Sequence, residues 1–446
     1  MKIPEAPPPL SDVTAAIARV ADDPDRARAL WREVARGPAP DGAYRHWNTL
    51  RRITPPVPLT VREVWAARKF ARMGLYRELP LLDTDGKPFR YALVDPVLER
   101  LHRIDRNAAG QVELPDTTAT PGARDRYVMR SLMEEAITSS QLEGAATTRR
   151  VAKAMLRSGR PPRDRSEQMI LNNYRAMNYV RERTGEPLTP AFVEAVQRIV
   201  VAETAEADAP AYRVVGDGVA VYDDQNQLLH RPPPAAEIPE RMARLCTFAN
   251  EAETGVFLHP VLKSVLLHFW LAYDHPFSDG NGRTARALFY WSMLREGFWL
   301  AEFLSVSAVL KRAPARYAES FLYTETDDND VTYFLLGQLR AVELAIEELM
   351  RHLARRADEI RETEALIGPD SDLNHRQRQI LSHALRHPDA VYDIASEQAR
   401  HGVTYATSRS DLLGLVEAGL LNKGQRGRKF LFSVPADLHA RIAKTR

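Results

Sequence analysis

Residues 275–286 read His275-Pro276-Phe277-Ser278-Asp279-Gly280-Asn281-Gly282-Arg283-Thr284-Ala285-Arg286. Pro276, Gly280 and Gly282 interrupt any helix that precedes them, because proline lacks a backbone donor and glycine is costly inside a helix. Small and apolar residues then recur at helical spacing, at Ala285, Leu288, Phe289 and Met293. The stretch therefore predicts a glycine-rich loop that opens onto a helix.

A loop of this kind is suited to binding an anion. The first N–H groups of a helix have no partner within it, and its dipole is positive there, so phosphate is the usual guest. Gly280 and Gly282 allow a close backbone approach, and Asn281 adds a side-chain donor. Arg283 and Arg286 bring charge-assisted donors to the same place.

Two further residues extend this site toward chemistry. Asp279 is suited to holding Mg2+ against phosphate oxygens, and His275 to accepting a proton from an attacking hydroxyl. A tight loop with a solvated aspartate and surface arginines would explain any one of these residues, but not their coincidence within twelve positions. Together they predict a site for phosphate-ester transfer.

The stretch resembles the signature of Fic-domain proteins, HPFx[DE]GNGRxxR, and departs from it at no position. Most Fic proteins are adenylyltransferases, which move AMP from ATP onto a protein hydroxyl. The resemblance implies that His275 deprotonates a Tyr, Ser or Thr hydroxyl of a target and that Asp279 holds Mg2+. It also implies that residues 280–282 bind the phosphates and that Arg283 and Arg286 hold their β/γ end. ATP and Mg2+ are the cofactors it implies.

Length and composition bound the remaining possibilities. A chain of 446 residues with 44% apolar residues is long enough for two or three domains. The net charge of +2 argues against strong global attraction to nucleic acid or anionic membranes. No apolar run approaches a membrane span or a secretory signal, and the single cysteine, Cys246, excludes an internal disulfide. A cytoplasmic protein with no membrane partner is expected.

The expected fold is mainly α: a Fic-type helical core with a β-hairpin flap, a helical N-terminal region and a C-terminal winged helix domain. Composition shifts place these parts at residues 1–120, 121–360 and 370–446. In the first part, we expect helices within 12–34, a helix capped by Thr60 and a hairpin over 81–92 with a turn at Asp85-Gly86. This part carries no catalytic constellation.

Residues 125–144 predict a helix that ends at Gly144, which places Glu143 where the helix dipole disfavours an anion. On local physics alone, a solvated Glu143 is the simpler interpretation. However, Ser139-x-x-x-Glu143-Gly144 resembles the inhibitory-helix motif of Fic proteins, [S/T]xxxE[G/N]. The resemblance implies a self-inhibited, class II member in which Glu143 pairs with Arg286 and displaces the γ-phosphate of ATP.

Residues 212–230 predict a β-hairpin, from β-rich runs at 212–215 and 219–222 that are followed by a turn and by 228–230. In Fic proteins, a hairpin flap here clamps the target segment. We therefore expect Val219, Ala220, Val221 and Tyr222 to bind a target strand. An edge hairpin without a partner is the alternative.

The remaining helices frame the loop. Ser166, Thr189 and His259 are expected helix caps, and His268, on an apolar helix, is expected to be a core histidine. No cysteine or second carboxylate has zinc-ligand spacing, so no zinc is expected. Residues 324–330 predict an acidic loop, usually solvated. By resemblance, Tyr317 and Tyr323 are candidates for contact with the adenosine.

The tail predicts helices at 376–386, 394–400 and 404–418, then strands at 420–422 and 429–432. This order resembles a winged helix-turn-helix, which would bind DNA through its third helix and its basic wing. The expected contacts are Tyr405, Thr407, Ser408, Arg409, Lys423, Arg426, Arg428 and Lys429. A protein-binding or dimerising winged helix explains the pattern equally well.

The leading hypothesis is thus a protein adenylyltransferase that Glu143 inhibits. A second hypothesis keeps the site but has it remove AMP or transfer another phosphate-linked group. A third is a DNA-binding regulator whose Fic site is largely silent. The target protein stays open, as do self-modification and a homodimer.

Overall fold

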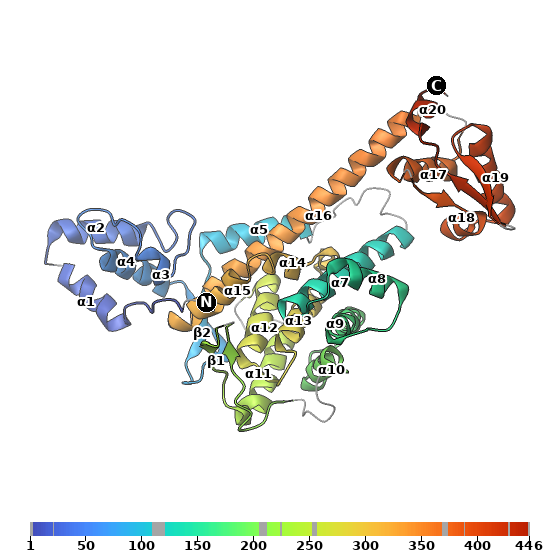
Figure 1. The fold of residues 1–446 in the computed structure, drawn as a ribbon. Coiled ribbons are helices and arrows are strands. Elements are labelled where there is room, and N and C mark those ends of the chain that lie inside the picture. Colours follow the sequence, from blue (N-terminus) through green and yellow to red (C-terminus); the bar gives the residue numbers. More distant parts are fainter. Residues whose placement is uncertain are drawn as a thin grey trace. The chain divides into compact units, whose positions relative to one another are not determined.

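The computed structural model describes residues 3–20, 22–108, 121–204, 212–223, 225–251, 257–367, 373–387, 389–426 and 429–444. The chain divides into two compact units, with the division between Leu349 and Met350 (Figure 1). The expected boundary near residue 120 borders residues outside these ranges. Residues on both sides of it belong to the first unit.

The first unit is helical, which confirms the expected fold class. Its N-terminal elements are α1 (Leu10–Val20), α2 (Pro24–Ala35), α3 (Trp47–Leu50), α4 (Val61–Met73), the strands β1 (Tyr76–Leu82) and β2 (Pro88–Ala92), and α5 (Asp95–Ala108). Thr60 caps α4 in a capping box with Glu63, as expected. A core that includes Trp47 and Trp65 joins α1, α2 and α4. The strands β1 and β2 pair as an antiparallel hairpin, which begins at Tyr76, earlier than the sequence indicated.

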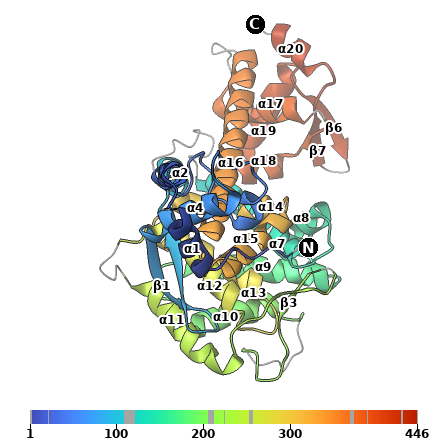
Figure 2. The ribbon, with the colours of Figure 1, turned by 90° about the vertical axis from the view of Figure 1, so that its left-hand side faces the viewer.

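The signature loop, residues 275–280, joins two buried helices, α12 and α13. The elements of this part of the chain are α7 (Pro121–Leu142), α8 (Arg149–Ser158), α9 (Arg165–Glu182), α10 (Pro190–Val201), β3 (Val221–Tyr222), β4 (Leu228–His230), η1 (Ala235–Glu237), α11 (Ile238–Asn250), α12 (Pro260–Asp274), α13 (Asn281–Arg295), η2 (Trp299–Phe303), α14 (Val306–Leu310), α15 (Pro314–Thr326) and α16 (Thr332–Ile367). Figure 2 shows α12 and α13 at the centre, with α9, α10 and α11 against them. Nearly every residue of α12 and α13 is buried, so the loop between them has a rigid base.

Three expected details of this helical core have clear outcomes. His259 and Thr189 cap α12 and α10, as expected, whereas Asp164 rather than Ser166 caps α9. The Ser166 hydroxyl instead accepts from the N–H of Ala146 at 3.0 Å. His268 is a core histidine: its Nε2 lies 2.9 Å from the Tyr317 hydroxyl, and burial lowers its pKa to about 3.

The acidic loop between α15 and α16 is not a solvated loop. Asp327 and Asp330 are at most 1% exposed, and Asp327 pairs with Lys69 and with Arg72 (3.0 Å) of α4. Tyr76 donates to Asp330 at 2.8 Å. Helix periodicity could not reveal this, because the cations that neutralise the loop lie about 250 residues earlier in the sequence.

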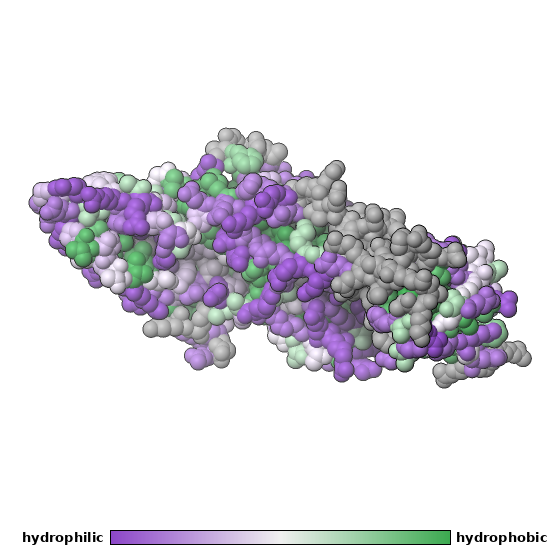
Figure 3. Space-filling view, turned by 90° about the horizontal axis from the view of Figure 1, so that it is seen from above, coloured by the Kyte–Doolittle hydropathy of each residue, from purple (hydrophilic) through white to green (hydrophobic). Residues whose placement is uncertain are grey.

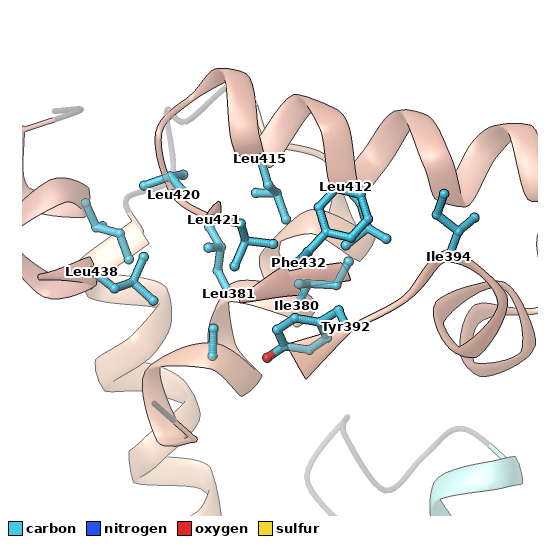
Figure 4. Packing of buried hydrophobic residues seen from close by; sticks show 12 residues of the cluster. Ile380, Leu381, Tyr392, Ile394, Leu412, Leu415, Leu420, Leu421, Phe432 and Leu438 are labelled. Carbon is cyan, nitrogen blue, oxygen red and sulfur yellow. The ribbon is translucent and has the colours of Figure 1, made fainter. Parts of the chain in front are cut away.

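The second unit begins within α16. It contains α17 (His375–Arg386), β5 (Val391–Tyr392), α18 (Ile394–His401), α19 (Tyr405–Glu417), β6 (Asn422–Arg426), β7 (Lys429–Ser433) and α20 (Leu438–Lys444). The strands form a sheet in the order β5-β7-β6. The expected strand at 420–422 is displaced: Leu420 and Leu421 are core residues around Phe432 (Figure 4), and β6 begins at Asn422.

Within the described part of the chain, no helix is both long and apolar enough to span a membrane. On the face drawn in Figure 3, hydrophilic residues make up most of the coloured surface. Hydrophobic residues lie between them in small groups, which is normal for exposed apolar side chains.

Asp327→Ala is expected to lower the free energy of unfolding by about 3–5 kcal/mol, because it removes the buried carboxylate that Lys69 and Arg72 share and leaves Lys69 only the exposed Asp328. Asp328→Ala is the matched control on the same loop: Asp328 also pairs with Lys69, at 3.0 Å, but its side chain is 57% exposed, so its loss should cost about 1 kcal/mol or less. Urea denaturation measures both. Equal losses for the two variants would contradict the importance of the buried pairing.

Candidate functional site

The loop turns sharply at both ends. His275 closes α12 with φ 46°, and Gly280 opens α13 with φ 86°, both in the left-handed region. For a histidine this conformation costs about 1–2 kcal/mol, so its surroundings must hold it. At Gly280 a side chain is also excluded by packing, because a Cβ there would lie 2.9 Å from Val201 Cγ1 of α10.

Asn281 holds the loop closed. Its Oδ1 accepts from the N–H of Phe277 at 2.9 Å, and its Nδ2 donates to the Phe277 carbonyl at 2.7 Å. Phe277 is fully buried and stacks on Tyr212. These bonds use one of the two N–H groups of the amide, so the expectation that Asn281 supplies a donor for phosphate stays a prediction.

Arg286 and Glu143 are in direct contact. Arg286 Nη2 donates to Glu143 Oε1 at 2.8 Å, while its Nε and Nη2 donate to the hydroxyl and the carbonyl of Ser139 at 2.8 and 3.0 Å. Burial opposes the charge of Arg286, but Glu143 raises its pKa above the ordinary value. Gly144, with φ 91°, follows α7 in the left-handed conformation.

Glu143 lies at the start of α13. A Cβ added to Gly282 would overlap its carboxylate, so Glu143 is packed against the backbone of Gly282. The N-terminus of a helix favours a negative charge there. A carboxylate therefore lies where the sequence predicted a bound phosphate, and its side chain is still 36% exposed.

Glu135, two helical turns before Glu143, is a residue that the sequence analysis missed. It is 1% exposed and accepts from the Ser307 N–H and the Ser305 hydroxyl at 3.0 Å. Burial raises its pKa, although Ser307 and Arg286 favour the anion. The four-residue spacing of Glu135, Ser139 and Glu143, which places them on one face of α7, was the available signal.

Arg283 and Asp279 form a second pair. Arg283, 1% exposed, donates to the Val200 carbonyl at 3.0 Å and to Asp279 Oδ1 at 3.1 Å. Asp279 also accepts from the N–H of Gly280 at 2.6 Å. Among the residues that the structure describes, no three His, Cys, Asp or Glu side chains form a metal site. That Asp279 holds Mg2+ stays a prediction; one carboxylate would fit this ion, which commonly takes its other ligands from phosphates and water.

His275 is half-buried, and its Nδ1 lies 3.3 Å from the Ala272 carbonyl. A carbonyl can only accept, so Nδ1 carries the proton and Nε2 keeps its lone pair. Burial lowers the pKa of His275 to about 4, and Arg213 and His230 nearby act in the same direction, against Glu143. His275 is therefore neutral at physiological pH and competent as a base.

The hairpin beside His275 is shorter than expected. Strand pairing is limited to β3 and β4, so Val221 and Tyr222 are in the hairpin, whereas Val219 and Ala220 precede it. Residues 212–215 are not a strand: Arg213 is buried and bonds to the signature loop. Tyr222 is 50% exposed and Val215 81%, so apolar side chains are available around the hairpin.

Tyr317 and Tyr323, the two residues expected to contact adenosine, lie in different surroundings. The Tyr317 hydroxyl contacts His268, and both Arg286 and Glu143 influence its pKa, which burial raises to about 12. Tyr323 lies six residues later, on another face of α15, and stacks on His46 with 4.3 Å between ring centres. Contact with adenosine stays a prediction for both residues, and the two lie on different faces of α15.

In the second unit, Tyr405 and Arg409 are exposed on α19, and Lys423 is exposed on β6. Ser408 is buried, and its hydroxyl donates to the Ile394 carbonyl at 3.0 Å, so the expectation that it contacts DNA is wrong. Arg428 and the side chain of Arg426 lie outside the described residues.

Residues 187–293 match the family model described as the Fic/DOC family. The chain contains a Fic domain. The matched range includes the whole signature loop, with His275 and Asp279, and also Arg283 and Arg286 of α13, whereas Glu143 lies before it.

Relatives and a solved structure agree with this domain. A protein adenylyltransferase Fic of Culex quinquefasciatus is 39% identical over 69 residues, which are 16% of this chain and 14% of that one. Another, of Nematostella vectensis, is 26% identical over 208 residues, 45% of each chain. The chain thus spans less than half the length of these relatives. The crystal structure of a Fic family protein from Desulfovibrio desulfuricans G20 aligns with a TM-score of 0.53 and 18% identity over 78% of this chain and 98% of that one, which shows a shared fold.

His275 and His268 are expected to titrate far below an ordinary histidine, with midpoints near pH 4 and pH 3. Because the unfolded chain protonates both near pH 6.5, stability should fall as the pH falls from about 6.5 toward these values. NMR of histidine-labelled protein gives the midpoints, and His275→Gln and His268→Gln assign the signals. A midpoint near 6.5 for His275 would contradict the role of burial.

Proposed function

We propose that this protein is a protein adenylyltransferase, which transfers AMP from ATP to a hydroxyl of a target protein. The observation that carries the proposal is that one rigid loop has a neutral histidine at its first residue and an arginine-lined anion position at its far end. The Fic domain and the names of the relatives point to the same reaction.

The chemistry divides among the residues of the loop. His275 Nε2 accepts the proton of a target Tyr, Ser or Thr hydroxyl. The hydroxyl oxygen then forms a bond to the α-phosphorus, and the bond to the β-phosphate oxygen breaks, so that pyrophosphate leaves. The backbone of Gly280 and Gly282 and the guanidinium of Arg286 stabilise the phosphate charge. Mg2+, held by Asp279, would neutralise phosphate charge during the transfer.

Glu143 is proposed to inhibit this reaction. Its carboxylate takes a donor of Arg286 and lies against Gly282. A terminal phosphate at the same position would place two anions together and would lose the Arg286 contact. Displacement of Glu143 is therefore required before ATP binds productively. The partial exposure of its side chain makes that displacement feasible without unfolding α7.

The test is transfer of radiolabel from α-phosphate-labelled ATP to protein. Glu143→Gly should raise transfer by about tenfold or more, which corresponds to about 1.4 kcal/mol of lost competition. Glu143→Gln, which keeps the shape but loses the charge, should raise it less. Glu134→Gln is the control on the same helix, since Glu134 pairs with Arg149 and Lys153 instead. His275→Ala should abolish transfer.

Equal labelling of the unaltered protein, Glu143→Gly and His275→Ala would overturn the proposal. Release of AMP from a modified target by the unaltered protein, lost in Glu143→Gly, would instead favour the removal of AMP. The target itself is sought by mass spectrometry of Glu143→Gly protein incubated with ATP, Mg2+ and host lysate.

The second unit supports a separate function, binding to duplex DNA. Arg409 is exposed on α19, and Lys423 is exposed on β6, where its ammonium lies 4.2 Å from the ring centre of Phe430. A helix and a basic hairpin that present cations are suited to the major groove and the phosphate backbone.

Fluorescence anisotropy of the full chain with duplex DNA tests this function over a range of salt concentrations. We expect affinity to fall linearly with the logarithm of salt concentration. Arg409→Ala and Lys423→Ala should weaken binding, whereas Arg441→Ala, in which the lost cation is paired with Asp437, should not. Binding that is absent at low salt, or that all three variants reduce equally, would count against DNA as the partner.

A further inference from the structure

Four consecutive backbone carbonyls, where α12 passes into the signature loop, accept hydrogen bonds from Arg213, which precedes the β3–β4 hairpin, and from His230, the last residue of β4. His230 Nε2 lies 2.8 Å from the Tyr273 carbonyl. Arg213 bonds to the next three: Nη2 to Asp274 at 3.3 Å, Nε to His275 at 2.9 Å, and its backbone N–H to Pro276 at 2.9 Å. The hairpin is therefore joined directly to the backbone that carries His275.

Arg213 links the segments that lie before and after the hairpin. It precedes β3, and its Nη2 also donates to the carbonyl of Pro233, which follows β4. The last carbonyls of α12 have no partner within the helix, and a cation there complements the negative end of the dipole. A buried guanidinium with fixed planar geometry meets several carbonyls at once, which lysine cannot do.

His230 contributes a second charge. Its Nδ1 lies 2.8 Å from Glu325 Oε2 of α15, and its Nε2 faces the Tyr273 carbonyl. Both neighbours accept, so both nitrogens donate and the ring is an imidazolium. Although burial opposes the charge, Glu325 raises the pKa of His230, and Asp274 adds to this. Arg213, His275 and the Tyr273 phenol, whose ring centre lies 4.8 Å from that of His230, are also close by.

These contacts bear on the strained geometry of His275. Its left-handed conformation persists only while the peptide groups on both sides are held. The His275 carbonyl is directed at Arg213, and the carbonyls of Tyr273 and Asp274 before it are held in the same way. A shift of the hairpin would therefore move the His275 imidazole, which in the proposed reaction faces the target hydroxyl.

We propose that Arg213 and His230 are positioning residues, which fix the orientation of His275 and make it depend on what occupies the β3–β4 hairpin. This inference rests on the proposed adenylyl transfer. It assigns to the hairpin a second task besides contact with a target strand: a strand that pairs with it stabilises the geometry of the base.

The experiment uses the full chain with Glu143→Gly as the parent. Arg213→Lys is expected to lower kcat for AMP transfer by about 10- to 100-fold, the usual result of a small misplacement of a reacting group, with the KM for ATP unchanged. His275 should also shift in the NMR spectrum. Arg295→Lys is the matched control, because Arg295 also donates to loop carbonyls, those of Thr184 and Glu186, at the other end of α13; it should change neither.

His230→Gln adds a readout that a merely structural role would not alter. Glutamine keeps a donor toward the Tyr273 carbonyl but has no titrating group. The parent should lose activity as the pH rises through the raised pKa of His230, and His230→Gln should not show this alkaline loss.

An unchanged kcat and an unchanged His275 signal in Arg213→Lys would overturn the inference, as would equal effects of Arg213→Lys and Arg295→Lys. A parent that transfers no AMP would instead refute the proposed function. The NMR signal of His275 would still decide whether Arg213 positions it.

Discussion

The site depends on how the buried guanidinium of Arg286 is paired. The guanidinium is buried at the start of α13 and must find anionic or carbonyl partners there, because an unpaired buried charge is costly. In this structure α7 supplies them, through Ser139 and Glu143. The same requirement makes the position attractive to a phosphate. Under the proposed function, inhibition by Glu143 and binding of a substrate phosphate are two ways of satisfying one buried cation, and they exclude each other.

The rest of the loop is rigid, which leaves few ways to regulate it. Asn281 uses both ends of its amide on Phe277, and Arg283 is held by Val200 and Asp279. These contacts hold both side chains in place. Glu143, by contrast, follows the end of α7 and is partly exposed. The part that is free to move is therefore the Glu143 carboxylate rather than the loop, as expected where catalysis needs preorganised donors.

The sequence predicted those parts of the site that are contiguous. The loop from His275 to Arg286, the helix that follows it and the core role of His268 were all accessible, because they depend on local spacing. The Glu143–Arg286 pair was accessible only through the resemblance of two short motifs. Arg213, Glu135 and Asp327 were not, because each is explained by partners far along the chain. The sequence alone does not distinguish a buried charged side chain from a solvated one.

One helix joins the parts that the sequence kept separate. On α15, Tyr317 faces His268 and Glu325 binds His230, while Asp327 follows directly and pairs with Lys69 and Arg72. The contact between Tyr317 and His268 lies near Arg286. The contact between Glu325 and His230 supports the hairpin, and the pairs of Asp327 are made to the N-terminal region. Because buried ionic contacts of this kind have one good geometry, a displacement of α4 would be transmitted to α15. The N-terminal region is thus paired with the residue that follows α15, the helix whose Glu325 contacts His230 of the hairpin.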